Sequence, residues 1–264
     1  MSDTIKILFL GDIVGEPGRT AAAKYVKQSL AEGRVDFVIA NGENAAGGKG
    51  VSGRLAIDLL RSGIAVVTTG DHAWDQKDTA SFIDTEPRLL RPLNYPKGVP
   101  GHGSIILETS KCKVAVMNIQ GRTFMKQLME NPFHAAINEV NRLREETPVI
   151  FVDFHAETTS EKIAMGRFLD GSVSAVIGTH THVQTADERI LPQGTAFLCD
   201  VGMCGPHESV LGREPSNVIR KFLDNMPGPL PIAHGPVRVD GVTVEVNIAT
   251  GLAKGIERVS EIVK

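Results

Sequence analysis

Residues 148–182 read PVIFVDFHAETTSEKIAMGRFLDGSVSAVIGTHTH, and this stretch is the clearest guide to the architecture of the chain. It contains two short apolar runs, PVIFVDFH (148–155) and SAVIGTH (174–180), which are typical of buried β-strands. Between them, SEKIAMGRFLDG (160–171) has the pattern of a helix. A strand, a helix and a second strand in succession predict a largely parallel or mixed sheet flanked by helices. We therefore expect an α/β protein.

The same alternation continues through most of the sequence. Further buried strands are expected at residues 5–11, 35–41, 65–70, 113–119 and 195–202, and further helices at 18–32, 53–63 and 132–146. The tail differs, because residues 241–263 predict an antiparallel hairpin that turns at Thr250 and Gly251. The Gly/Pro-rich segment 92–103 reads as a surface loop, and the sequence shows no linker, repeat or low-complexity segment. We expect residues 1–264 to form a single domain.

Composition limits the kinds of partner. Hydrophobic residues make up 42% of the 264 residues, the formal net charge is -3 and the pI is about 6.2. No global positive field would hold the chain on long nucleic acid or an anionic membrane, whereas a small phosphate ester stays compatible with a metal site that supplies local positive charge. The N-terminal sequence lacks the features of a signal peptide, and the three cysteines form no C-x-x-C pair. We expect reduced, buried thiols and a cytoplasmic location.

Polar side chains follow five of the expected strands. The strand ends carry Asp12 (LFLGD), Glu43 and Asn44 (IANGEN), Asp71 and His72 (TTGDH), His155 (FVDFH), and His180 and His182 (IGTHTH). In open α/β sheets, ligands bind just beyond the carboxyl ends of the strands. Each residue alone has another explanation, since Asp12 could cap the following helix and His155 could be a core histidine. Together they would be costly to bury unless a cation neutralised them.

The ligand types favour two transition-metal ions. Mixed oxygen and nitrogen ligands without thiolate suit iron, manganese or zinc. Seven candidate ligands are too many for one ion and about right for two that share a carboxylate. A pair of such ions can stabilise an in-line phosphoryl displacement and generate hydroxide near neutral pH. The pattern therefore predicts hydrolysis of a phosphoester.

The blocks GDIVG, NGEN, GDHAWD, FHAE and GTHTH resemble, in order, the metal-binding blocks of the calcineurin-like metallophosphoesterase superfamily. GDIVGEPGR, ANGENAAGG, TTGDHAWD and DVGMCGP look most like its YmdB-like branch, which is related to 2′,3′-cyclic nucleotide phosphodiesterases. The resemblance covers essentially the whole chain from about Ile5. It implies a metallophosphoesterase sandwich, with mixed sheets flanked by helices.

The resemblance also assigns roles to residues of this chain. Glu43 would bridge the two ions, and His72 would be no ligand but the general acid at the leaving oxygen. The other six residues divide between the ions as Asp12, Asn44 and His182 for one, and Asp71, His155 and His180 for the other. A metal-bridging hydroxide would attack phosphorus. The family implies a 2′,3′-cyclic nucleotide or another small phosphodiester as substrate, and homo-oligomerisation is a further expectation from the resemblance.

Two positions depart from the family pattern. Asp71 stands where the family usually has Asn, which brings a third carboxylate to the site or leaves Asp71 outside the ligand set. His207 stands where an aromatic residue is more common, and the sequence assigns it no role. Two other functions stay open at this point. One is a phosphomonoesterase or broader phosphodiesterase with the same centre, and the other is a regulatory nucleotide-binding protein with little turnover.

Overall fold

The computed structural model of the chain describes residues 3–263 and contains two β-sheets. The larger sheet has the order β2-β12-β13-β1-β3-β4-β5, with β14 paired to β13. Its strands are β1 Thr4–Leu10, β2 Asp12–Ile13, β3 Phe37–Asn41, β4 Val66–Thr68, β5 Leu89–Leu90, β12 Met203–Pro206, β13 Val237–Asn247 and β14 Ala253–Val263. The smaller sheet has the order β10-β11-β9-β8-β7-β6. Its strands are β6 Ser104–Glu108, β7 Lys113–Gln120, β8 Ile150–His155, β9 Ala175–Thr179, β10 Arg189–Ile190 and β11 Ala196–Leu198.

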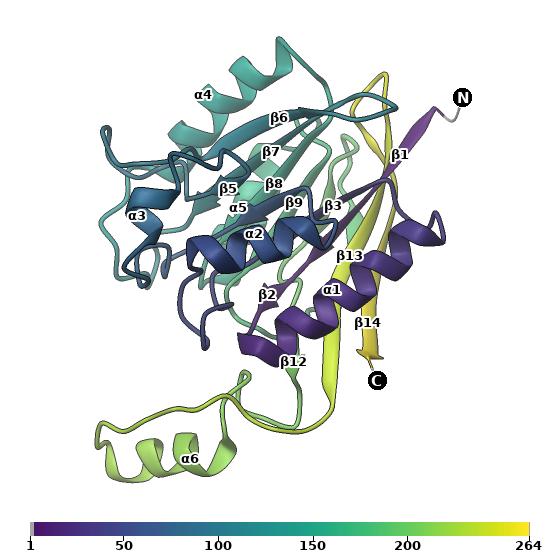
Figure 1. The fold of residues 1–264 in the computed structure, drawn as a ribbon. Helices are drawn as coiled ribbons and strands as arrows, with labels where there is room; N and C mark the ends of the chain where they lie inside the picture. The colour runs from purple at the N-terminus through teal and green to yellow at the C-terminus, as the bar shows by residue number, and fades with distance from the viewer. Residues whose placement is uncertain (1–2, 264) are drawn as a thin grey trace.

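The described helices are α1 Gly15–Ala31, α2 Gly53–Arg61, α3 Thr79–Phe82, α4 Pro132–Arg144, α5 Thr159–Phe168 and α6 Pro215–Asp224. The longer helices other than α6 cover the outer faces of the two sheets (Figure 1). The helices α1 and α2 pack on the larger sheet, and α4 and α5 pack on the smaller one. The expected α/β fold with mixed sheets flanked by helices is confirmed, as are the seven expected strands, the four expected helices and the C-terminal hairpin.

Side-chain alternation in the strands explains the layers. In β1, Leu8 and Leu10 point to the core under α1 and α2, whereas Ile7 and Phe9 point to the core between the sheets. Phe9 meets Phe151 of β8 across this inner core, with ring centroids 5.2 Å apart. Strands buried on both faces read as continuous apolar runs, which is why the sequence pattern identified them.

The carboxyl ends of β1, β3 and β4 lie at the same end of the molecule as those of β8 and β9. The pairs β1·β3 and β3·β4 are parallel in the larger sheet, and β8·β9 is parallel in the smaller one. Contacts such as that between Asn44 and His182 join the loops that follow β3 and β9, so the two sheets present these ends to one another. Both sheets therefore contribute to one site.

The helix α6 is the one described helix that lies away from the two-sheet body. It is carried on two extended arms between β12 and β13 (Figure 1). It is not among the helices expected from the sequence. None of the described helices is long and apolar enough to span a membrane.

Candidate metal centre

Four ligand-type side chains converge where β3, β4, β8 and β9 end. Ligand atoms of Glu43, Asp71, His155 and His180 all lie within 4.8 Å of one another. His155 Nε2 lies 3.1 Å from Glu43 Oε1, 3.2 Å from Asp71 Oδ1 and 3.0 Å from His180 Nδ1. Two carboxylates and two imidazoles thus point at one small volume, which is the donor set of a transition-metal ion. The structure brings Asp71 into this cluster rather than leaving it outside.

A second set of three side chains lies beside the first. His182 Nε2 is 3.0 Å from Asn44 Oδ1 and 3.9 Å from Asp12 Oδ1. Asn44 donates its amide to the carbonyl of Gly48, which leaves its oxygen directed at His182. Asp12 does not cap α1, because the N-cap is Val14 without a side-chain bond, and Asp12 Oδ2 instead accepts the backbone N–H of His180.

Each histidine of the two sets has its other ring nitrogen held by a partner. His155 Nδ1 lies 2.9 Å from Thr179 Oγ1, and that hydroxyl donates its hydrogen to Asp153. Thr179 must then accept the hydrogen bond from His155, so Nδ1 carries a proton, and Nε2 is the nitrogen that could give its lone pair to a bound ion. By the same logic, His180 Nε2 meets Glu157 at 3.0 Å and His182 Nδ1 meets the carbonyl of Leu211 at 3.3 Å. In every case the free nitrogen is the one that faces the other ligands.

Charge is concentrated and buried at this centre. Burial alone would raise the pKa of Asp71, but hydrogen bonds from His155 and His180 hold that pKa well below its ordinary value. Burial alone would lower the pKa of His155, yet Glu43 and Asp71 raise it well above 6.5. Burial raises the pKa of Asp153 to about 6. With no ion bound, His155 supplies the positive charge that the Glu43 and Asp71 carboxylates favour, and a cation at the same place could replace its proton.

Two observations test whether divalent ions fit here. Asp12 Oδ1 is buried and has no hydrogen-bond partner among the residues that the structure describes, although it faces His182. At Gly70, an added Cβ would lie 2.2 Å from Glu43 Oε2 and 2.3 Å from His155 Nε2. The backbone at Gly70 therefore leaves open the space between the ligands, and an orphaned carboxylate oxygen points to the second set. The residues present fit a pair of divalent ions.

The turn that carries His180 and His182 is backed by a buried ion pair. Both histidines have positive φ, 101° and 65°, a backbone region that side chains other than glycine rarely adopt. Asp200 Oδ2 accepts the N–H of Thr181 at 3.1 Å and the Lys162 ammonium at 2.6 Å. Lys162 and Asp200 are both only 1% exposed. This pair holds the strained turn in place.

His72 lies next to the cluster without belonging to it. Its backbone N–H lies 3.4 Å from Glu43 Oε2, and its Nδ1 lies 2.9 Å from Asp75 Oδ2. With Nδ1–H directed at Asp75, Nε2 is the nitrogen left for a substrate. His72 also lines a cavity of about 610 Å³ whose floor includes Glu43, Asn44, His180 and His182. A volume of this size lies within the roughly 300–1,000 Å³ of small-molecule sites.

Several residues near the centre were missed or left open by the sequence. Asp153, Glu157 and Thr179 orient ligands, yet only Asp153 had a usable signal, because it lies two residues before His155 on the same face of β8. Trp74 packs against Tyr95 and the core under α2, so it is a packing residue. His207 bonds the buried Asp240 at 3.0 Å.

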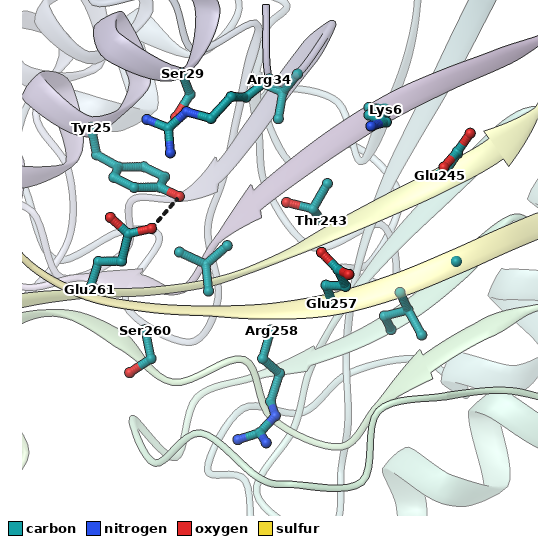
Figure 2. A pocket seen from close by; sticks show the side chains of 14 residues that line it. Lys6, Tyr25, Ser29, Arg34, Thr243, Glu245, Glu257, Arg258, Ser260 and Glu261 are labelled. Carbon is teal, nitrogen blue, oxygen red and sulfur yellow. Dashed lines mark hydrogen bonds between the residues drawn. The ribbon is translucent and has the colours of Figure 1, made fainter. Parts of the chain in front are cut away.

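A second cavity of about 640 Å³ lies between α1 and the strands β13 and β14. Figure 2 shows its lining, in which the Tyr25 hydroxyl donates to Glu261. Both acidic and basic side chains line it, and it includes no member of the ligand cluster. We therefore do not assign the reaction to this cavity.

Comparison with known proteins gives consistent results. The sequence profile of the YmdB-like protein family matches residues 8–259. The chain is 45% identical over 255 residues to a protein of Bacillus subtilis named 2′,3′-cyclic-nucleotide 2′-phosphodiesterase, covering 97% of this chain and 96% of that protein. The crystal structure of a novel phosphatase from Mycoplasma pneumoniae superposes with a TM-score of 0.92 at 35% identity, over 99% of this chain and 95% of that one. A hypothetical protein from Thermus thermophilus superposes with a TM-score of 0.91 at 37% identity, over 98% and 100% of the two chains.

Proposed function

Because the chain belongs to the YmdB-like protein family, we propose that it is a metal-dependent phosphodiesterase whose preferred substrates are 2′,3′-cyclic nucleotides. The observation that carries the proposal is the convergence of Glu43, Asp71, His155 and His180 within 4.8 Å, beside Asp12, Asn44 and His182. The name of the Bacillus subtilis relative supplies the substrate class.

The seven residues would hold two ions. Asp71, His155 and His180 would bind one ion, Asp12, Asn44 and His182 the other, and Glu43 both. The oxygen and nitrogen donors suit iron or manganese, with zinc as an alternative. When bound, the two ions supply a water nucleophile of lowered pKa and neutralise charge on the phosphate.

The protein side chains then control geometry and protons. Thr179, Glu157 and the Leu211 carbonyl keep the imidazole lone pairs directed inward, so the ligands need not reorganise. As water attacks phosphorus and the bond from phosphorus to the ribose oxygen breaks, His72 donates its Nε2 proton to that oxygen. Asp75, 2.9 Å from Nδ1, stabilises the imidazolium that makes the donation.

The test pairs metal analysis with activity. The purified protein should carry about two transition-metal ions per chain, lose hydrolysis on chelation and regain it with added manganese or iron. A 2′,3′-cyclic nucleotide should be cleaved faster than a linear dinucleotide or a phosphomonoester. Activity that resists chelation in a metal-free protein would refute the metal centre. Preference for the monoester would make the chain a phosphomonoesterase, and binding without turnover would make it a regulator.

We also propose that the described residues act as one domain in the cytoplasm. Strands of both sheets share the inner core through contacts such as Phe9 with Phe151, which supports one folding unit. The three cysteines are free thiols, two of them buried, which supports a reducing compartment.

Assembly into a homo-oligomer stays a prediction from the family resemblance. Light scattering of the purified protein would measure the oligomeric state.

A further inference from the structure

The cavity over the metal centre has one wall whose side chains have no part in the proposed reaction. That wall comes from the α6 segment, whose lining residues are Val210, Leu211, Arg213, Val218, Lys221, Phe222, Asn225 and Leu230. The same cavity is also lined by Glu43, His180 and His182. A molecule with its phosphate on the ligands would therefore have the rest of its structure against α6.

One face of α6 is directed into this cavity. Its lining residues Val218, Lys221 and Phe222 are spaced at intervals of three and four, so they share one side of the helix, and Asn225, the C-cap of α6, lines the cavity just beyond its end. With Val210, Leu211 and Leu230 they make this wall mainly apolar. Phe222 is 83% exposed, so the face of its ring is open to stacking.

Hydrogen bonds to the metal-ligand loops fix the position of this wall. Arg213 donates to the carbonyls of Gly47 and Gly48 at 3.1 and 2.6 Å, in the turn that follows Asn44. The carbonyl of Leu211 bonds His182 Nδ1. Glu214 N–H bonds the Pro231 carbonyl at 3.0 Å, which ties the outgoing arm to the returning one. The α6 segment is thus held by the same loops that carry ligands.

Two lysines give the cavity a positive rim. Lys49, on the glycine turn, and Lys221, on α6, both line it. Neither makes an ion pair with an acidic side chain in residues 3–263. Unpaired ammonium groups beside an apolar wall complement a molecule that is anionic at one end and flat and apolar at the other.

We propose that this wall is the nucleobase subsite, in which the base of the substrate stacks on Phe222 while Lys221 and Asn225 meet its polar edge. The proposal rests on the proposed phosphodiesterase function and adds to it the residues that recognise the base. Base stacking on an aromatic side chain tolerates any base, because every base has a π-face. The enzyme should therefore accept all four 2′,3′-cyclic nucleotides.

The experiment measures kcat/KM on two substrates that differ only in the base. They are 2′,3′-cyclic AMP and the 2′,3′-cyclic phosphate of a methyl riboside, both followed by phosphorus NMR. Phe222→Ala should lower the ratio of nucleotide to abasic kcat/KM about tenfold, mainly through KM, as the loss of one stacked base predicts. Phe222→Trp should keep the ratio. Leu223→Ala is the matched control, because Leu223 is 82% exposed on the same helix and does not line the cavity.

The outcomes separate the two proposals. An unchanged ratio in Phe222→Ala, or an equal drop in Leu223→Ala, would overturn the subsite. If the wild type cleaves neither substrate, the phosphodiesterase proposal fails, and the subsite is decided by equilibrium binding of adenosine 3′-monophosphate. Phe222→Ala must then bind at least about fivefold more weakly than Leu223→Ala, and equal affinities would refute the subsite.

Discussion

Gly70 offers the most direct perturbation of the metal centre, because a single methyl group there would occupy the space between ligands. The added Cβ of Gly70→Ala would lie 2.2 Å from Glu43 Oε2 and 2.3 Å from His155 Nε2, where contacts under 3.0 Å essentially never occur. Gly70 does not have positive φ, so alanine brings no backbone strain. The variant keeps every ligand residue and every charge, but its methyl group forces the side chains of Glu43 and His155 out of position.

The expected loss of metal affinity follows from how little the distances between a metal ion and its ligands can vary. Ligand distances in metal sites vary by only about 0.2 Å, and changes that merely reorient a ligand weaken binding by about 10–100-fold. We therefore expect Gly70→Ala to lose at least about 100-fold in metal affinity. At a manganese concentration about 100 times the wild-type Kd, the ion stabilises the wild type by about 2.7 kcal/mol and the variant by about 0.4 kcal/mol. For a chain of this size, the metal-induced rise in Tm should fall from roughly 5–10 °C to about 1 °C.

The assay combines elemental analysis after dialysis with thermal unfolding, with and without manganese. Gly255→Ala is the control, because a Cβ there meets nothing within 4 Å and the residue lacks positive φ. It should match the wild type in metal content and in Tm shift. Wild-type metal content together with a wild-type Tm shift in Gly70→Ala would refute the argument that the ions lie beside Gly70.

Three further variants test individual ligands and the general acid. Glu43→Ala should lose metal more readily than Asn44→Ala, because Glu43 is proposed to touch both ions, and equal metal content in the two would argue against the bridge. Asp71→Asn should keep its metals with activity equal to or above the wild type, since the amide oxygen can still ligate, whereas metal loss would mean that the site requires a third carboxylate. His72→Ala should keep both metals and lose about 10²–10⁴-fold in kcat on a nucleotide ester, but much less on a nitrophenyl ester whose leaving oxygen hardly needs a proton. Equal losses on the two esters would exclude His72 as the acid, and metal loss would make it a ligand.

The structure bears on several features that the sequence had left open. Asp71 proved to contact both His155 and His180, so its carboxylate faces the cluster despite the unusual residue type at this position. Gly47, Gly48 and Gly50 all have positive φ, and Gly48 packs against the guanidinium of Arg213. These close contacts depend on a segment more than 160 residues away in the sequence.

The helix α6 shows where sequence patterns fail. Pro215 marks its start, and Ile219, Phe222 and Leu223 are apolar residues at helical spacing. These side chains are mostly exposed, because the helix covers no core. The periodic pattern is typical of a helix, but it cannot indicate whether the apolar side chains pack on a core, line a cavity or stay exposed.

The sequence by itself determined the strands and the residues that follow them. Runs such as residues 5–11 and 148–155 are buried on both faces, so they consist mainly of consecutive apolar residues that can be recognised from the sequence. Ligands such as Glu43 and His155 could be identified because they stand at or just after a strand, where the chain direction alone fixes the edge of the sheet. Only the tertiary structure decided which atoms meet there. Asp12 contacts His180 and Asn44 contacts His182 because the two sheets stack through a shared apolar core. The hydrophobic effect that drives this stacking is not directional, so the apolar pattern of the sequence does not show which strand ends will meet.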